Sequence, residues 1–367
     1  MSSILSPAQI IEIQPRARVR SMPEYHPPLG HRDRLRLDFN ENTLGCSPAV
    51  KHALENISAA DLTRYPEREP VEARAAQHLG LQPEQVILTN GVDEAIHVLC
   101  QAFLDAGDEL LLPVPTYTMY EIYASATDAT LRKVQAGASF EFPCESLLEA
   151  INPSTKLIAI ANPNSPTGSI ATREQILSIA QAAPQAIVLV DEAYFHFYGE
   201  TVINLVGKVP NLIVSRTFSK AYGLAGLRLG LLAGSESLLQ WVRRVLSPYS
   251  VNSIALTALT ASLEDSAYVD WYVAQVKQAR TEFLAGLTSL GLHWWPTQAN
   301  FVLVNIGPAH KQFVAAMREQ GILVRDRSAD PGCMGCVRIT IGTPEQMQPA
   351  LAAIAQFLQS PSNGAAQ

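Results

Sequence analysis

A single lysine, Lys220, lies in a stretch of small and apolar residues, SRTFSKAYGLAGLRLG, that runs from Ser215 to Gly230. An ammonium ion is poorly solvated in such a setting, and a lysine kept from water can act as a nucleophilic amine that forms a Schiff base with a carbonyl group. The alternative is a surface lysine whose stem covers apolar atoms while its ammonium reaches water. The stretch by itself favours neither reading.

Five of the predicted strands are followed directly by turns that contain polar residues. These turns are Asn90-Gly91, Pro115-Thr116-Tyr117, NPNSPTG over 162–168, DEAY over 191–194 and SRTFSK over 215–220. In open α/β sheets, ligands bind outside the carboxyl ends of the strands. We therefore expect these five turns to converge on one crevice.

Two of these turns carry binding chemistry. In TNGVDEAI a glycine turn runs directly into a helix, whose first N–H groups and dipole suit an anion; the alternative is a capped helix with Asp93 in its first turn. In IVLVDEAY an apolar strand ends in carboxylates, and a buried carboxylate at Asp191 needs a cation or strong donors. A solvated acidic loop is the alternative there. Tyr194 adds a phenol that can face the same pocket.

Together these groups describe one cofactor. Lys220 suits an aldehyde, and Asp191 suits a protonated ring nitrogen. Arg228, Thr217 and Ser219 can hold a phosphate beside the aldehyde, together with the helix that follows the glycine turn. Pyridoxal 5'-phosphate has all three groups, and a lysine Schiff base with an acidic partner for the pyridinium nitrogen is its usual protein setting.

The elements that must position these residues alternate between strand and helix. The predicted strands are VILT, ELLLPV, KLIAIA, AIVLV, NLIVS and RLGLLA, and helical segments lie between several of them. This pattern favours a mainly parallel sheet with helices on both faces, an α/β/α arrangement of three layers. From about Val251, long helical segments precede the strands FVLVNI, ILVRD and CVRITIG and two further helices, which predicts a smaller α+β domain.

We expect the chain to divide at these changes of pattern. Residues 1–35 form an N-terminal arm and part of the small domain, 36–255 the large cofactor-binding domain, 256–360 the small C-terminal domain and 361–367 a flexible tail. Boundaries read from sequence carry an uncertainty of a few residues.

The motifs in this order resemble those of the histidinol-phosphate aminotransferase family, class II aminotransferases of the pyridoxal-phosphate-dependent fold type I. The matching stretches are LDFNENTLGCSP, RYPE, TNGVDEAI, PTYTMY, NPNSPTG, DEAY, SRTFSKAYGLAGLRLG, SPYSVNS, QANFVLV, GILVRDR and VRITIGT. They span nearly the whole chain, and their order and spacing make the match specific.

The resemblance implies roles around the cofactor ring. Lys220 matches the Schiff-base lysine and Asp191 the partner of the pyridine nitrogen. Tyr194 matches the donor to the phenolic oxygen of the ring, and Tyr117 the aromatic residue that stacks on the ring.

The resemblance also implies a phosphate site. Val92 and Asp93 match the helix start that binds the phosphate through backbone N–H groups, and Ser219 and Arg228 match further ligands. Tyr65, in RYPE, matches a tyrosine that reaches the phosphate of the neighbouring subunit. The family therefore implies a homodimer whose sites are shared across the interface.

One position departs from the family pattern. The family usually has an asparagine directly before PTG, which also contacts the phenolic oxygen of the ring, whereas this chain has Ser165. A hydroxyl is shorter and donates one hydrogen, so Ser165 reaches the cofactor through a water or leaves Tyr194 to act alone. Asn162 and Asn164 are nearby but out of register.

Two arginines of the predicted small domain suit a substrate anion. In CVRITIG, alternate apolar residues share one strand face and Arg338 takes the other, and its planar fork suits a carboxylate or phosphate. The family uses the matching arginine for a substrate anion. A second arginine, Arg325, suits a dianionic phosphate, although an ion pair with Asp326 or Asp330 is the alternative.

The resemblance implies a transamination in two half-reactions, histidinol phosphate and 2-oxoglutarate giving imidazole acetol phosphate and glutamate in histidine biosynthesis. Tyr25, Tyr249 and Asn300 match further substrate-side positions. Two alternative functions use the same fold. One is a transaminase of aromatic or other amino acids, for which Arg325 is less important, and the other is a lyase similar to threonine-phosphate decarboxylase. A regulator that binds pyridoxal phosphate normally carries a DNA-binding domain, for which no helix-turn-helix precedes Leu37.

Other motifs favour packing over chemistry. Cys333 and Cys336 have the spacing of half a zinc site or a redox pair, but no second pair or histidine cluster is near in sequence, so we expect a loop and no metal. We expect His196, which follows DEAYF, to have a packing role and no catalytic one. GLAGLRLG is not the G-x-G-x-x-G fingerprint of nicotinamide enzymes.

Composition limits the partners and the compartment. The net charge is -7 with acidic and basic residues interspersed, so we expect no nucleic-acid partner and no membrane surface. No apolar run approaches the roughly 20 residues that span a bilayer, and no secretory signal is evident at the start. Five scattered cysteines favour a reducing compartment, the cytoplasm.

Overall fold

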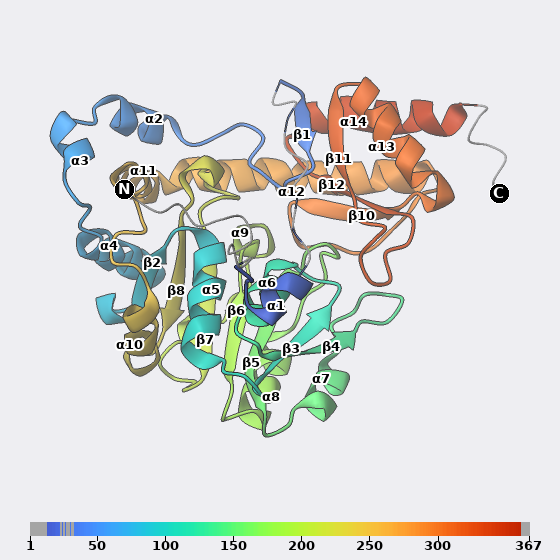
Figure 1. Ribbon diagram of the computed structural model, residues 1–367. Helices are drawn as coiled ribbons and strands as arrows, with labels where there is room; N and C mark the ends of the chain where they lie inside the picture. The colour runs from blue at the N-terminus through green and yellow to red at the C-terminus, as the bar shows by residue number, and fades with distance from the viewer. Residues whose placement is uncertain (1–12, 23, 25, 27–29, 31–32, 361–367) are drawn as a thin grey trace, which may run out of the picture.

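The computed structural model of the protein describes residues 13–22, 24, 26, 30 and 33–360. Tyr25, which was predicted to lie near the substrate, and the predicted tail 361–367 fall outside the described residues. Two sheets organise the chain, and helices cover and connect them (Figure 1).

The larger sheet has seven strands in the order β2-β8-β7-β6-β5-β3-β4. They are β2 (Val86–Thr89), β3 (Glu109–Val114), β4 (Thr130–Gln135), β5 (Thr155–Ala161), β6 (Ile187–Asp191), β7 (Leu212–Thr217) and β8 (Gly230–Gly234). Neighbours pair in parallel except β8, which is antiparallel to β2 and β7. The predicted mainly parallel sheet is confirmed. The sequence analysis missed β4, because this edge strand is mostly exposed and its sequence, TLRKVQ, has no apolar run.

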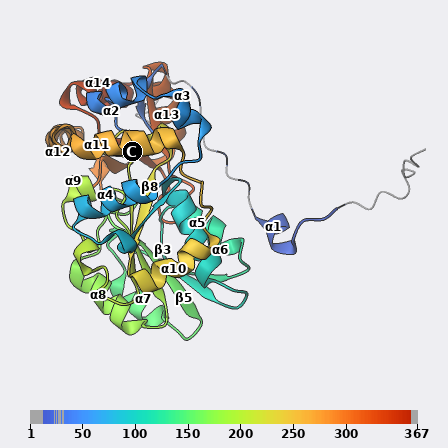
Figure 2. The same ribbon diagram turned by 90° about the vertical axis from the view of Figure 1, so that its left-hand side faces the viewer.

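Each face of this sheet has its own hydrophobic core, because successive side chains of a strand point to opposite sides. In β5, Leu157 and Ala159 belong to one cluster of buried side chains, whereas Ile158 and Ile160 belong to the other. Figure 2 shows helices on both sides of the sheet. One side has α5 (Gly91–Phe103), α6 (Met119–Ser125) and α10 (Glu236–Val245), and the other has α4 (Glu69–Leu79), α7 (Cys144–Ala150) and α8 (Arg173–Ala182). The predicted α/β/α layering is thereby confirmed.

The smaller sheet has five strands in the order β1-β11-β12-β10-β9. They are β1 (Leu35–Leu37), β9 (His293–Trp294), β10 (Phe301–Asn305), β11 (Ile322–Asp326) and β12 (Cys336–Thr340), with α13 (His310–Glu319) and α14 (Pro344–Gln359) beside them. β1 pairs in parallel with β11, so the chain joins this sheet before it reaches the larger one. β1 therefore straddles the predicted boundary between residues 35 and 36, and the boundaries themselves stay predictions.

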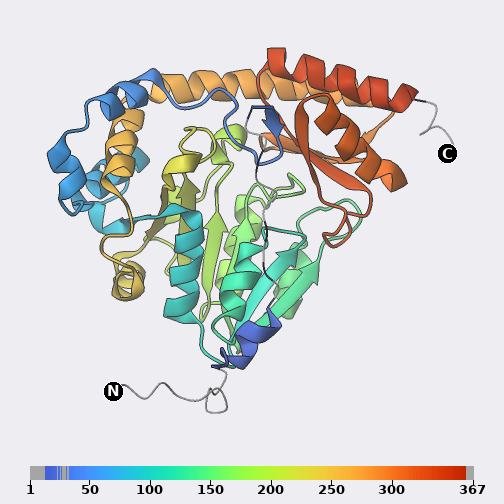
Figure 3. The same ribbon diagram turned by 45° about the horizontal axis from the view of Figure 1, so that its top comes forward.

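A pair of helices connects the two sheets. α11 (Ser253–Glu264) leads into α12 (Ser266–Ser289), whose 24 residues run along one side of the molecule toward the smaller sheet (Figures 1 and 3). Within the described part of the chain, no helix is both long enough and apolar enough to cross a bilayer. The remaining elements are α1 (Ala17–Ser21), α2 (Pro48–Glu55), α3 (Ala59–Thr63), α9 (Phe195–Tyr198) and the short 3-10 helices η2 (Pro83–Gln85), η3 (Ile203–Leu205), η4 (Ala225–Leu227) and η5 (Gly307–Ala309).

Six strands of the larger sheet, all except β8, point the same way. Because β8 is antiparallel to both of its neighbours, β2 runs in the same direction as β7, β6, β5 and β3. Their carboxyl ends meet at one edge, which faces β10 and α12 in Figure 1. The expected convergence of the polar turns follows from this topology.

Gly230, at the start of β8, is a point where two backbones touch. A Cβ atom there would lie 2.7 Å from Val92 N and from Gly91 C, whereas a Cβ at Gly226 would meet nothing within 4 Å. We expect Gly230→Ala to lower the free energy of unfolding by about 1–3 kcal/mol because backbone must shift. Gly226→Ala is the matched control, expected to change it by less than about 1 kcal/mol. Urea unfolding measures both, and equal values would contradict this reading of the contact.

Candidate active site

A buried carboxylate lies at the end of the central strand β6. Asp191 Oδ2 accepts a hydrogen bond of 2.7 Å from the hydroxyl of Tyr120, a residue of α6. Asp191 Oδ1 is also buried and accepts no hydrogen bond from the described residues. Burial raises the pKa of Asp191, and the hydrogen bond from Tyr120 opposes that rise. The free oxygen therefore favours a ligand that brings a positively charged N–H group.

The start of α5 forms a second feature of the same edge. Val92 is buried there, and Asp93 lies in the first turn of the helix. Asp93 Oδ2 accepts a hydrogen bond of 2.9 Å from Arg228 Nη2, and Asp93 Oδ1 accepts one of 2.8 Å from the hydroxyl of Tyr117. The side chain of Asp93 thus orients two other predicted site residues, beyond the backbone role that the resemblance implies.

Glycines let the backbone come close to Arg228 at this helix start. Gly91 has φ +79°, and a Cβ atom there would lie 2.5 Å from Arg228 Nη2. Arg228 itself has φ 54°, in the left-handed region. A guanidinium held against the first turn of a helix adds its charge to the helix dipole, so this place suits an anion.

The remaining predicted phosphate ligands lie beside Arg228. Arg228 Nη1 donates to Ser219 Oγ at 3.5 Å, and the backbone N–H of Ser219 donates to Thr217 Oγ1 at 3.1 Å. Both small residues are buried. The structure therefore brings Thr217, Ser219 and Arg228 together, as the sequence predicted.

Lys220 lies between the two sheets. Its Nζ donates a hydrogen bond of 2.8 Å to Phe39 O, in the segment that follows β1. It also lies 6.0 Å from the centroid of the Tyr194 ring. The lysine is half-buried and does not reach out over the surface, which favours the reactive amine over the surface alternative.

Both the hydroxyl group and the ring of Tyr194 contact other side chains. Its hydroxyl accepts a hydrogen bond of 2.9 Å from Asn40 Nδ2, and its ring packs edge-on against Phe301 of β10, with centroids 5.0 Å apart. Asn300, next to Phe301, is fully buried and donates from Nδ2 to Asn40 O at 3.2 Å, while its Oδ1 accepts no hydrogen bond from the described residues. The phenol therefore lies at the contact between the two sheets.

Arg338, on β12, points into the same region. Its Nη1 donates to Ser165 Oγ at 3.0 Å and its Nη2 to Asp38 O at 2.6 Å. Burial, with smaller contributions from nearby charged groups, lowers the pKa of Arg338 to about 10. Ser165, at the position that departs from the family pattern, is therefore a neighbour of the predicted substrate-binding arginine.

Arg325 is the direct cross-strand neighbour of Arg338. The two residues are opposite each other in the antiparallel pair of β11 and β12. Arg325 Cζ lies 5.6 Å from the centroid of the Phe39 ring. Two guanidinium groups side by side repel each other unless an anion lies near them, so this place suits a group with more than one negative charge.

The ion pairs of the neighbouring acids run to other residues. Asp326 pairs with His310 at 3.1 Å, and Asp330 pairs with Arg327 at 2.5 Å. The charges of Arg325 and Arg338 also act on Asp330, where they oppose the rise in its pKa that burial causes, so the alternative partner of Arg325 lies close to the arginine pair.

Tyr65 and Tyr249 lie together on the surface. Their rings stack with centroids 4.5 Å apart, and their side chains are 77% and 55% exposed. The structure thus brings together one residue that was predicted to serve a neighbouring subunit and one that was predicted on the substrate side.

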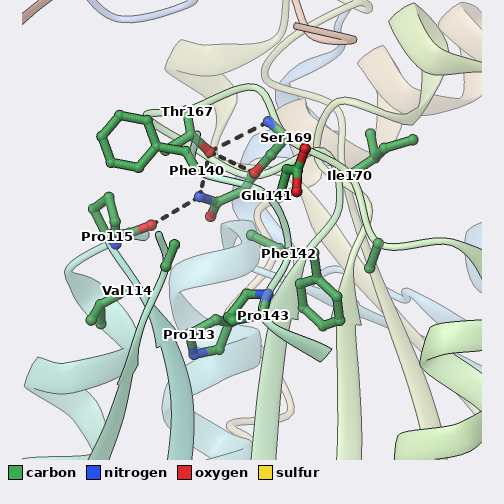
Figure 4. A pocket seen from close by; sticks show the side chains of 14 residues that line it. Pro113, Val114, Pro115, Phe140, Glu141, Phe142, Pro143, Thr167, Ser169 and Ile170 are labelled. Carbon is green, nitrogen blue, oxygen red and sulfur yellow. Dashed lines mark hydrogen bonds between the residues drawn. The ribbon is translucent and has the colours of Figure 1, made fainter. Parts of the chain in front are cut away.

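The side-chain amides of Asn162 and Asn164 form hydrogen bonds with the backbone and with neighbouring hydroxyl groups. Asn162 exchanges two hydrogen bonds with Ala171, and Asn164 Nδ2 donates to Pro115 O and to Thr167 Oγ1. Figure 4 shows the hydrogen bonds at Pro115, Thr167 and Ser169 beside a hollow of about 20 Å³. That volume holds about one water molecule. The hollow is therefore too small for a substrate, and the hydrogen bonds of Asn164 beside it hold the turn in place.

The motifs that favoured packing in the sequence contact other side chains. Cys333 and Cys336 are buried beside Phe140 and Trp295, and no three metal-ligating side chains of the described residues lie together. Burial lowers the pKa of His196 to about 3, so its imidazole is neutral.

These groups fit pyridoxal 5'-phosphate as a set. The unpaired oxygen of Asp191 suits the protonated ring nitrogen. The start of α5 with Arg228 suits the phosphate, because the first N–H groups of the helix lie beside a guanidinium that the absence of a side chain at Gly91 lets come close. Lys220 offers an amine to the aldehyde, and Tyr194 a hydroxyl to the ring oxygen.

A mainly parallel sheet with a buried aspartate at the end of β6 and a half-buried lysine after β7, at the same edge, is typical of aminotransferases of fold type I. The family model for aminotransferase class I and II matches residues 32–354. The chain belongs to this family.

Individual relatives agree with this assignment. A histidinol-phosphate aminotransferase of Geobacillus sp. (strain WCH70) is 33% identical over 361 residues, which cover 94% of this chain and 98% of that protein. One from Anoxybacillus flavithermus is 34% identical over 334 residues, 89% of each chain. The structure of a histidinol-phosphate aminotransferase from Sinorhizobium meliloti in complex with pyridoxal-5'-phosphate has a TM-score of 0.85 over 96% of this chain and 99% of that one. At 24% identity it shows a shared fold. The family resemblance seen in the sequence is confirmed.

Two residues of the site were missed in the sequence. Tyr120 lies in the first turn of α6, three residues after Tyr117, which precedes the helix, and the two rings meet edge-on with centroids 5.9 Å apart. Asn40 lies in LDFNENT, and no local signal assigns its amide a partner 154 positions away.

The raised pKa of Asp191 predicts how stability changes with pH. The folded state binds the proton more tightly than the unfolded chain, so the free energy of unfolding of the cofactor-free protein falls as the pH rises above about 4. Asp191→Asn should remove this fall and raise the free energy of unfolding at pH 7 by on the order of 1 kcal/mol. It should also weaken cofactor binding.

Urea unfolding of the cofactor-free proteins at several pH values measures the effect. Glu84→Gln removes the same charge at an exposed site and should change stability by less than about 0.5 kcal/mol. A variant at Asp191 with the pH slope of the wild type would contradict the prediction.

Proposed function

We propose that the protein is a pyridoxal-phosphate-dependent transaminase that converts histidinol phosphate and 2-oxoglutarate into imidazole acetol phosphate and glutamate, a step of histidine biosynthesis. The observation that carries the substrate is the neighbouring pair Arg325 and Arg338, which border the segment that Lys220 contacts. The names of the relatives support the same substrate.

The cofactor is held by groups from five turns. Asp191 Oδ1 pairs with the ring nitrogen, and Tyr117 covers the ring. The backbone N–H groups at Val92 and Asp93 bind the phosphate, together with Ser219, Thr217 and Arg228. When bound, pyridoxal phosphate supplies an electron-withdrawing ring that stabilises negative charge developing at the substrate Cα.

The chain's own residues move and hold the protons. With the cofactor bound, Lys220 Nζ would serve as general base and general acid, taking the proton from the substrate Cα and giving it back later in the reaction. Asp191 keeps the ring nitrogen protonated, because its charge is otherwise uncompensated in a buried place. Tyr194 donates to the phenolic oxygen of the ring. Ser165 Oγ accepts from Arg338, which leaves its single hydrogen free to donate, but its side chain is shorter than the asparagine usual at this position.

The substrate site has to accept two different anions in turn. Histidinol phosphate carries a phosphate where an amino acid carries its carboxylate, and glutamate brings carboxylates to the same place. Two planar guanidinium groups satisfy both, since each offers paired donors. Asn300, Tyr249 and Tyr25 complete this side of the site.

A second copy of the chain completes the site. Tyr65 is exposed and stacked on Tyr249, so two large aromatic rings lie together on the surface, where a partner chain can cover them. In the homodimer Tyr65 reaches the phosphate of the neighbouring subunit. An active monomer at assay concentration, by light scattering, would contradict this.

The enzyme works in the cytoplasm. All five cysteines are unpaired thiols, as a reducing compartment requires.

The deciding experiment separates the proposed reaction from its rivals. The purified protein is loaded with pyridoxal phosphate, trapped with borohydride and digested, and mass spectrometry is expected to find the pyridoxyl group on Lys220. Donors are then compared by the loss of visible absorbance: histidinol phosphate, glutamate, phenylalanine and threonine phosphate. Fastest conversion with histidinol phosphate supports the proposal. Faster conversion with phenylalanine, or release of carbon dioxide from threonine phosphate, would favour a rival.

Arg325 is expected to discriminate between the two substrates. Arg325→Ala should raise KM for histidinol phosphate by about 10- to 100-fold, because a charge-assisted hydrogen bond to a dianion is lost. The glutamate half-reaction should change several-fold less. Arg318→Ala, an exposed arginine on α13, is the matched control. Equal losses for both substrates would favour an amino-acid transaminase.

A further inference from the structure

Asn40 forms hydrogen bonds through both its side chain and its backbone at the contact between the two sheets. It is 1% exposed, and its φ of 55° lies in the left-handed region, which asparagine tolerates better than most residues. Its amide and backbone make four hydrogen bonds to Tyr194, Thr340 and Asn300. None of the roles described above uses this residue.

The direction of each proton in this network follows from one unambiguous donor. The backbone N–H of Asn40 donates to Thr340 Oγ1 at 3.0 Å. Thr340 Oγ1 also lies 3.1 Å from Asn40 Oδ1, so the threonine hydroxyl donates its single hydrogen to that oxygen. The amide is thereby fixed with Nδ2 toward Tyr194.

This orientation decides what the phenol can do. Asn40 Nδ2 donates to the Tyr194 hydroxyl at 2.9 Å, so the hydroxyl oxygen acts as the acceptor there. A phenol has one hydrogen to give, and the hydrogen of Tyr194 is left to point elsewhere, toward the crevice. An aspartate at position 40 would do the opposite, because a carboxylate only accepts.

The same strand carries the threonine and the predicted substrate arginine. Arg338 and Thr340 are two residues apart on β12, so their side chains share one face. Arg338 binds Asp38 O and Thr340 binds Asn40. The segment 38–40 is therefore held by the small sheet at both ends while it contacts Lys220 at Phe39 O.

We propose that Asn40 is a positioning residue that directs the hydroxyl proton of Tyr194 toward the phenolic oxygen of the cofactor, with Thr340 fixing the orientation of its amide. The inference rests on the proposed function, because it needs pyridoxal phosphate beside Tyr194. It is specific to a chain that has Ser165 at the position before PTG, where Tyr194 has less help from a neighbouring amide.

The test follows the ionisation of the bound cofactor and needs no turnover. A hydrogen bond given to the phenolic oxygen stabilises its anion, so losing that bond moves the pH midpoint of the visible absorbance change upward. Tyr194→Phe sets the full shift, expected to be about one pH unit or more. Asn40→Asp should approach that shift, because the phenol then donates to the carboxylate.

Further variants separate orientation from packing. Asn40→Gly keeps the left-handed backbone and leaves the phenol free to rotate, so its shift should be smaller than that of Asn40→Asp. Thr340→Val should shift the midpoint in the same direction, and Thr340→Ser, which keeps the hydroxyl, should not. Cofactor affinity by equilibrium dialysis and thermal unfolding of each cofactor-free variant accompany the titrations.

The outcomes distinguish the two proposals. An unchanged midpoint in Asn40→Asp and Asn40→Gly, with a shift in Tyr194→Phe, overturns the role of Asn40 and leaves the proposed function intact. A wild-type protein without a visible band after reconstitution overturns both. A variant at position 40 whose melting temperature matches the wild type but whose midpoint rises supports the inference.

Discussion

The buried carboxylate of Asp191 is the interaction on which the rest of the site depends. Its place at the end of β6 puts one oxygen against Tyr120 and leaves the other without a donor. A charge in that setting costs stability, and burial raises its pKa accordingly. The fold tolerates this cost because a cofactor with a basic ring nitrogen compensates it. The remaining residues are arranged around the position where that ring must then lie.

The segment 38–40 connects this centre to the small sheet. Three consecutive residues contact three groups of the reaction: Asp38 O binds Arg338, Phe39 O binds Lys220, and the amide of Asn40 binds Tyr194. In the proposed reaction, a substrate anion would compete with a backbone oxygen for Arg338, and the cofactor aldehyde would compete with another for Lys220. Binding at either group therefore acts on one short piece of chain, which provides a physical route between substrate, lysine and phenol.

The substitution of serine for asparagine before PTG has a local consequence. Ser165 Oγ lies within 3.0 Å of Arg338 Nη1, so the shorter side chain faces the substrate arginine. The neighbouring asparagines do not replace the missing amide, because Asn162 binds Ala171 and Asn164 holds the turn through Pro115 and Thr167. In the proposed function, the phenolic oxygen of the cofactor would then depend more strongly on Tyr194, which Asn40 contacts.

The sequence by itself determined the strands with apolar runs, the order of the turns and the identity of Lys220, Asp191 and Arg228 as candidates, because local pattern and residue chemistry carry that information. It did not give β4, whose exposed residues have no apolar period. Only the tertiary structure decided that Tyr120 bonds Asp191, that Asn40 bonds Tyr194 and that Arg325 lies opposite Arg338. The first two pairs are 71 and 154 positions apart, and which atoms meet over such separations depends on how the two sheets pack, since no local spacing encodes it.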